Sequence, residues 1–161
     1  MQLERIVEPS PLVGENQERV QETARRWLLI AVSTTAIIGL LHLGDHILRG
    51  KQYVLPYFGA VDTIWLAMAT YLFVLPPLYL TARGRLLTGY WLFAGMVATL
   101  LVGFGHLSPF AFESVHTIYM DHANDPPIAA LSLILLYSLF ASSLALIMAA
   151  VRVRRLTGSW R

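Results

Sequence analysis

The chain has 161 residues, of which 56% are hydrophobic and only 14% are charged, with a formal net charge of +2. Soluble domains carry about 25% charged residues, so most of this chain lacks a surface suited to water. It contains no cysteine, which excludes disulfides, thiolate-ligated metal sites, iron–sulfur clusters and covalently attached c-type haem. Because the basic residues lie in short groups beside apolar runs, we expect a membrane protein and no nucleic-acid partner.

A polar segment comes first along the chain, at 1–26. It carries five glutamates and lacks a short apolar core followed by a small-residue cleavage site, so we do not expect a secretory signal. Its second half, about 16–26, has the composition of a polar helix that leads directly into the first apolar run. We therefore expect 1–26 to be a cytoplasmic N-terminal segment.

Four apolar runs follow, at about 27–48, 61–82, 87–107 and 128–151. Each is close to the ~20 residues that a helix needs to cross about 30 Å of hydrocarbon. Inside a lipid bilayer the backbone must satisfy its own hydrogen bonds, so each run is predicted to be a helix. The predicted fold class is all-α, a polytopic bundle of four transmembrane helices over 27–151, followed by a basic cytoplasmic tail at 152–161.

The lysines and arginines predict the orientation of this bundle. Ten of the twelve lie before the first run, between the second and third runs, or after the fourth, and Arg49 and Lys51 are the two exceptions. Cytoplasmic loops of membrane proteins carry an excess of basic residues, so both termini are predicted to be cytoplasmic. We expect the membrane to be the plasma (inner) membrane of a prokaryote.

With that orientation, all five histidines and all four aspartates lie toward the outer face. The strongest local pattern is His42-Leu43-Gly44-Asp45-His46 in the first run. Positions i, i+3 and i+4 of a helix share a face, so His42, Asp45 and His46 project together. Two imidazoles one turn apart supply two nitrogen ligands to one ion, with the carboxylate as a third ligand or as a partner that orients a ligand.

His106 and the loop after the third run complete the candidate site. By the rise per residue, His46 and His106 lie within about 5 Å of the outer ends of their helices, at matching depth. Ser108 and Pro109 suit the start of a short amphipathic helix in the membrane interface. The remainder of this loop either covers the site or is solvated. The candidate metal ligands are His42, Asp45, His46, His106, His116 and His122.

A plainer interpretation of these residues also exists. Asp45 can pair with Arg49, which lies four residues further along the same helix face. His46 and His106 lie near the membrane interface, where an imidazole can face headgroups and water. On this interpretation the histidines bind nothing.

Three hypotheses of function follow. The first is a site for zinc, copper or iron, since imidazole and carboxylate without thiolate suit these ions. The second is an electron-transfer subunit with haem b, bound between His46 or His42 on the first run and His106 on the third. The third is an accessory or scaffold subunit, in a larger membrane complex or a homo-oligomer, with interfacial histidines. No pattern identifies catalytic residues or a substrate, so the sequence predicts neither.

Overall fold

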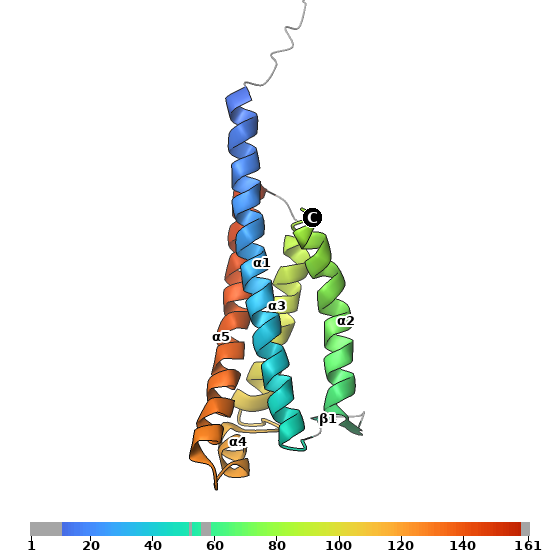
Figure 1. Cartoon of the computed structure of the whole chain (residues 1–161), viewed down its shortest axis with the longest axis vertical. Coiled ribbons are helices and arrows are strands. Elements are labelled where there is room, and N and C mark those ends of the chain that lie inside the picture. Colours follow the sequence, from blue (N-terminus) through green and yellow to red (C-terminus); the bar gives the residue numbers. More distant parts are fainter. Residues whose placement is uncertain (1–10, 52, 56–58, 159–161) are drawn as a thin grey trace, which may run out of the picture.

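Four long helices dominate the computed structural model, which describes residues 11–51, 53–55 and 59–158 (Figure 1). The elements in chain order are α1 (Pro11–Leu48), β1 (Tyr53–Leu55), β2 (Gly59–Val61), α2 (Thr63–Ala82), α3 (Thr88–Val102), the π-helix η1 (Gly103–Leu107), α4 (Val115–Asp121) and α5 (Pro126–Thr157). α1, α2, α5 and the continuous unit of α3 with η1 are each long and apolar enough to cross a membrane. This confirms the predicted helical fold with four helices that are long and apolar enough to span a membrane.

Helix α1 continues well beyond the apolar run that predicts it. It has 38 residues, which at 1.5 Å per residue gives a length of about 57 Å, roughly twice the thickness of the hydrocarbon. Its polar part contains the helix predicted at about 16–26. There Arg19 pairs with Glu15, and Arg26 pairs with Glu22, each one turn apart. The polar part and the apolar span therefore form one continuous helix.

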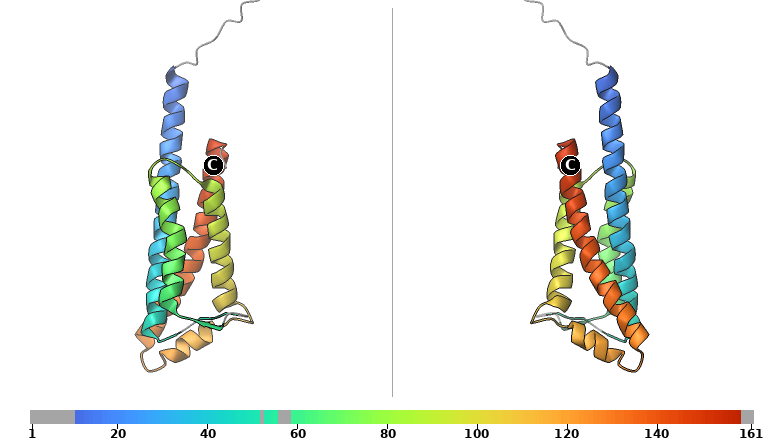
Figure 2. Two further views of the ribbon diagram at one scale, coloured as in Figure 1. Left: turned by 90° about the vertical axis from the view of Figure 1, so that its right-hand side faces the viewer. Right: turned by 90° about the vertical axis from the view of Figure 1, so that its left-hand side faces the viewer.

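Helix α5 lies against both α1 and α3, and α2 packs on α1 (Figures 1 and 2). The start of α1 and the end of α5 lie at the same end of the bundle, here called the terminal end (Figure 2). The core near this end consists of Ala24, Leu28, Val32, Trp91, Leu146, Ala150 and Val153. The indole of Trp91 donates a hydrogen bond to Thr81 Oγ1 (2.8 Å), which ties α3 to α2.

The bundle carries many of its large apolar side chains on the outside. Leu72, Leu101 and Met148 are 71%, 67% and 66% exposed. Soluble monomers rarely expose continuous apolar surface of this kind, whereas lipid would cover it. Small residues let the helices approach each other inside. A Cβ added to Gly95 would lie 2.9 Å from Ile147 Cγ1, so α3 and α5 are in close contact there.

Helix α4 lies across the opposite end of the bundle, here called the histidine end (Figures 1 and 2). A second buried cluster contains Val102, Ile118, Leu136 and Leu139, and so joins α4 to α3 and α5. At this end β1 and β2 form an antiparallel hairpin between α1 and α2, an element that the sequence did not predict. The cytoplasmic location of the termini stays a prediction.

The short helix after the third span begins later than Ser108 predicts. Its N-cap is Ser114 rather than Ser108. The residues between these two serines fold back onto η1, where the amide of Glu113 donates a hydrogen bond to the carbonyl of Gly105 (3.1 Å). Packing of this loop against η1 therefore overrides the local capping signal at Ser108.

Candidate metal centre

Three histidines from two elements meet at the histidine end. His42 and His46 lie one turn apart on α1, and His106 lies on η1. Their residues are 3%, 2% and 6% exposed, so all three are buried. The Nε2 atom of His42 lies 3.2 Å from Nε2 of His46 and 3.4 Å from Nε2 of His106. One nitrogen of each ring lies within 4.8 Å of the others, close enough for all three to bind one ion. These residues are called the histidine cluster below.

The local backbone explains why the rings converge. The i,i+4 spacing on α1 places His42 and His46 on one face of that helix. After α3 the third span widens into the π-helical turn with the sequence GFGHL, which carries His106. Such turns are rare and occur frequently at functional sites. The turn also presents the carbonyl of Gly105 to the amide of Glu113, so the following loop is held beside the cluster.

Glu113 fixes the outer nitrogen of two of the three rings. Its carboxylate Oε2 lies 3.2 Å from Nδ1 of His46, and its backbone carbonyl lies 2.9 Å from Nδ1 of His106. Because both groups are acceptors, Nδ1 of each neutral ring carries the proton and Nε2 carries a lone pair. Metal-binding histidines almost always donate their second nitrogen to a carboxylate, a carbonyl or water in this way. These contacts favour, in both rings, the tautomer that binds metal through Nε2.

Hydrogen bonds among the three rings cannot use every inward-facing nitrogen. The lone pairs of His46 and His106 both approach Nε2 of His42, which carries at most one proton and can donate it to only one of them. Nδ1 of His42 is buried and has no hydrogen-bond partner in the described part of the chain. Nitrogens bound tetrahedrally to zinc at 2.0–2.1 Å lie about 3.4 Å apart. The two Nε2 separations from His42 are close to that spacing, and the three rings together offer one nitrogen each within 4.8 Å of the others.

A buried arginine lies beside the cluster. The side chain of Arg49 is 1% exposed and contacts three carboxylates, those of Asp45 (3.0 Å), Asp121 (3.3 Å) and Glu113. Burial by itself lowers the pKa of Arg49, but the hydrogen bond to Glu113 and the charges of Glu113 and Asp45 raise it above its usual value. Arg49 therefore stays charged, and it holds Glu113 in contact with the cluster.

Asp45 lies on α1 beside His46 and makes the ion pair with Arg49 that the plainer interpretation expects. Its carboxylate accepts hydrogen bonds from Arg49 (3.0 Å) and from Ser132 of α5 (2.6 Å). The plainer pairing with Arg49 is thus the one that the structure contains. The three residues that the structure brings together are His42, His46 and His106.

The two remaining predicted ligands lie outside the cluster. Nε2 of His122 is 3.8 Å from Oδ1 of Asp45, beyond hydrogen-bond distance. His116 is exposed on α4. Binding of a metal by these residues or by Asp45 stays a prediction.

Glu113 is the residue of the site that sequence reasoning missed. Among the six glutamates of the chain, it is the one that lies outside the N-terminal segment. That isolation among the histidines and aspartates of the outer loops was an available signal. Its partners could not be found in this way, because Arg49, which directly follows α1, lies 64 residues earlier in the chain.

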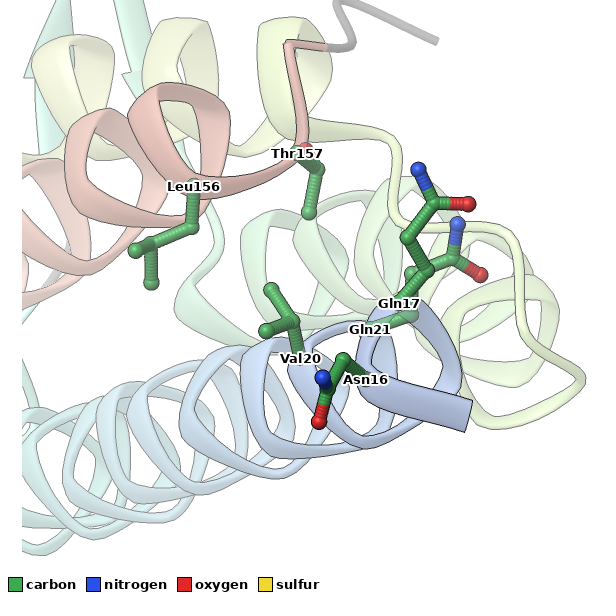
Figure 3. Close-up of a pocket in the computed structure, with 6 residues that line it drawn as sticks. All are labelled: Asn16, Gln17, Val20, Gln21, Leu156 and Thr157. Atoms are coloured by element: carbon green, nitrogen blue, oxygen red, sulfur yellow. The ribbon is translucent and has the colours of Figure 1, made fainter. Parts of the chain in front are cut away.

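A cavity of about 380 Å³ lies at the terminal end, between the start of α1 and the end of α5 (Figure 3). It is lined by Asn16, Gln17, Val20, Gln21, Leu156 and Thr157. These side chains offer amides and one hydroxyl but no imidazole or carboxylate. The cavity is therefore separate from the metal chemistry of the opposite end.

Comparison of the chain with protein-family models, with curated proteins and with solved structures finds no match. The chemistry of the histidine end consequently follows from its own geometry. Three nitrogen donors converge there, and two of them are oriented by a neighbouring acid residue.

Proposed function

We propose that this chain is an integral membrane metalloprotein whose histidine cluster binds one zinc, copper or iron ion. The observation that supports the proposal is the convergence of three buried imidazoles, with Nδ1 of two of them in contact with Glu113 on the outer side. Nitrogen donors without thiolate suit each of the three metals. We further propose that this centre lies at the outer face of the membrane, which the distribution of basic residues supports.

Three histidines leave one position of a four-coordinate ion for a further, exchangeable ligand. Three protein ligands plus one open position is the pattern of catalytic zinc sites, whereas structural sites have four protein ligands. The two nearest carboxylates are already engaged, since Glu113 is bonded to His46 and Arg49, and Asp45 to Arg49 and Ser132. We therefore propose that water or a small external ligand completes the coordination.

The same geometry disfavours haem b as the occupant. The ring centroids of His46 and His106 are 5.6 Å apart, and the ring of His42 lies 4.7 Å and 5.1 Å from them. His42 is thus nearly equidistant from the other two rings. A macrocycle held between His46 and His106 would need the midplane that the His42 ring occupies. A single ion needs only one nitrogen from each ring, and one nitrogen of each ring lies within 4.8 Å of the others.

Elemental analysis with matched histidine variants tests the proposal. The full chain, purified in detergent, stripped with a chelator and reloaded, is expected to retain one zinc, copper or iron ion. His106→Ala should lose it, whereas His116→Ala should retain it, because His116 lies apart on α4. A wild-type chain without metal, or equal metal in both variants, contradicts the proposal. A Soret band would instead establish haem. The absence of both a bound metal and a Soret band would favour the accessory-subunit hypothesis.

A further inference from the structure

The histidine cluster lies beneath a structural cover. The cover, defined as residues 103–125, comprises η1, the loop after it and α4, and it crosses the histidine end (Figures 1 and 2). It supplies His106 to the cluster, and Glu113 to the outer nitrogens of His46 and His106. Because the three imidazoles are at most 6% exposed, a hydrated ion cannot reach them while this end is closed.

Two basic residues at the end of α1 hold the cover in place. Arg49 contacts Glu113 and Asp121 of the cover. Lys51 contacts the other carboxylate oxygen of Asp121 (2.9 Å). Asp121 is the last residue of α4, so these contacts join the far end of the cover to α1. The four side chains Arg49, Lys51, Glu113 and Asp121 are called the latch below.

The cover is the element of this end best suited to open. Helix α4 has seven residues, and of these only Ile118 is buried. By contrast, α1 has 38 residues and α5 has 32, and both pack along the bundle. Segments with few buried apolar contacts open at a lower free energy than packed helices. Because apolar packing holds the cover only weakly, much of its attachment to the bundle comes from the latch.

The charges of the described residues also favour the approach of a cation at this end. The histidine end holds five carboxylates and two basic groups, namely Asp45, Asp62, Glu113, Asp121 and Asp125 with Arg49 and Lys51. The terminal end holds three carboxylates and eight basic groups, namely Glu15, Glu18 and Glu22 with Arg19, Arg25, Arg26, Arg83, Arg85, Arg152, Arg154 and Arg155. A surface with an excess of one sign raises the local concentration of ions of the other sign.

We propose that the cover is the gate through which the metal ion enters and leaves the histidine cluster, and that the latch sets the rate of its opening. This inference rests on the proposed function. The ion approaches the acidic histidine end, the contacts of Asp121 with Arg49 and Lys51 break, and the cover lifts. Once the ion is bound to His106 of the cover and to His42 and His46 of α1, these bonds and the latch together keep the cover closed.

A charge-matched pair of variants tests the latch. Asp121→Asn removes the partner of both Arg49 and Lys51 and leaves the contacts of Glu113 intact. Asp62→Asn removes the same charge from the same end, but Asp62 caps the start of α2 and lies outside the cover and the latch. In stopped-flow release to a chelator, Asp121→Asn should release its ion about tenfold faster, the effect of a barrier lowered by about 1.4 kcal/mol. Asp62→Asn should behave as wild type. Equal release rates for the two variants overturn the gate.

A crosslink provides the opposite test, and the absence of native cysteines makes it clean. The double variant Lys51→Cys, Asp121→Cys, joined by a short thiol-reactive crosslinker in the full chain in detergent, fixes the cover to α1. Locking the metal-free protein should slow uptake, and locking the loaded protein should slow release, relative to single-cysteine variants treated in the same way. Exchange at the unlocked rate overturns the gate.

Elemental analysis separates failure of the gate from failure of the proposed function. A locked protein that binds one ion and exchanges it freely contradicts only the gate. A wild-type chain that binds no ion contradicts the proposed function, and the gate with it.

Discussion

The two ends of the bundle use the same types of charged residue in different ways. At the terminal end Arg19 pairs with Glu15 and Arg26 with Glu22, each one turn apart on α1, and the two arginine side chains are 76% and 74% exposed. At the histidine end the side chain of Arg49 is 1% exposed. Two of its three carboxylate partners lie 64 and 72 residues away in sequence.

This difference indicates which ion pairs hold the tertiary structure. An exposed pair within one helix contributes about 0.3–0.5 kcal/mol, because water screens the charges and the helix forms without them. A buried arginine that joins three segments cannot be removed without leaving buried carboxylates uncompensated. Substitutions at the histidine end should therefore change tertiary stability and metal binding, whereas equivalent substitutions at the terminal end should change stability only slightly and leave metal binding unchanged.

The largest expected effect on stability is that of Arg49→Met. Removing one partner of a buried ion pair costs about 3–5 kcal/mol, and here the carboxylates of Asp45 and Glu113 would both lose their cation. Unfolding of the metal-free protein in a mild detergent, followed by circular dichroism, measures the loss. Arg49→Lys keeps the charge and should be intermediate. A variant Arg49→Met as stable as wild type would contradict the role assigned to this buried network.

Replacing Glu113 with glutamine should have the next largest effect. Glutamine keeps an oxygen that accepts a hydrogen bond from His46 but removes the charge that strengthens the imidazole as a ligand. Loss of such a partner typically weakens metal affinity by about 10–100-fold. Competition with a chelator of known affinity measures this change, and Glu18→Gln at the terminal end is the control. Equal affinities of the two variants would show that Glu113 does not act on the ligands.

The smallest effect is expected for Arg19→Met, the terminal counterpart of Arg49→Met. Its only described ion pair is with Glu15, one turn earlier on an exposed helix surface. The expected loss is no more than about 0.5 kcal/mol, and it should diminish in high salt. The same detergent unfolding assay measures both variants side by side. A loss comparable with that of Arg49→Met would remove the distinction between the two ends.

The apolar runs predicted the spans well, and the reason is physical. The run at about 61–82 corresponds to α2 at Thr63–Ala82, because a segment in hydrocarbon must bond its backbone internally. The proximity of His42 and His46 was equally predictable from the sequence, since a helix fixes the geometry of positions i and i+4. The sequence also named His106, from its depth in the third span.

The surroundings of the histidine cluster were harder to predict from the sequence. The π-turn that carries His106 has no compositional signature beyond two glycines. The loop position of Glu113 depends on a backbone contact with η1, and a capping signal at Ser108 pointed to a different local structure. For Asp45 the sequence allowed a metal ligand and an ion pair, and the structure shows the ion pair with Arg49.

The sequence by itself determined the number of spans, the helical state of each, and the gathering of histidines and aspartates at one end. These features depend on hydropathy and on helix periodicity, which act locally. The tertiary structure alone decided that three imidazole nitrogens face one another and that Glu113 orients two of them. Those contacts join residues up to 67 positions apart in the chain, as for His46 and Glu113, so they depend on how α1 packs against the third span and its following loop.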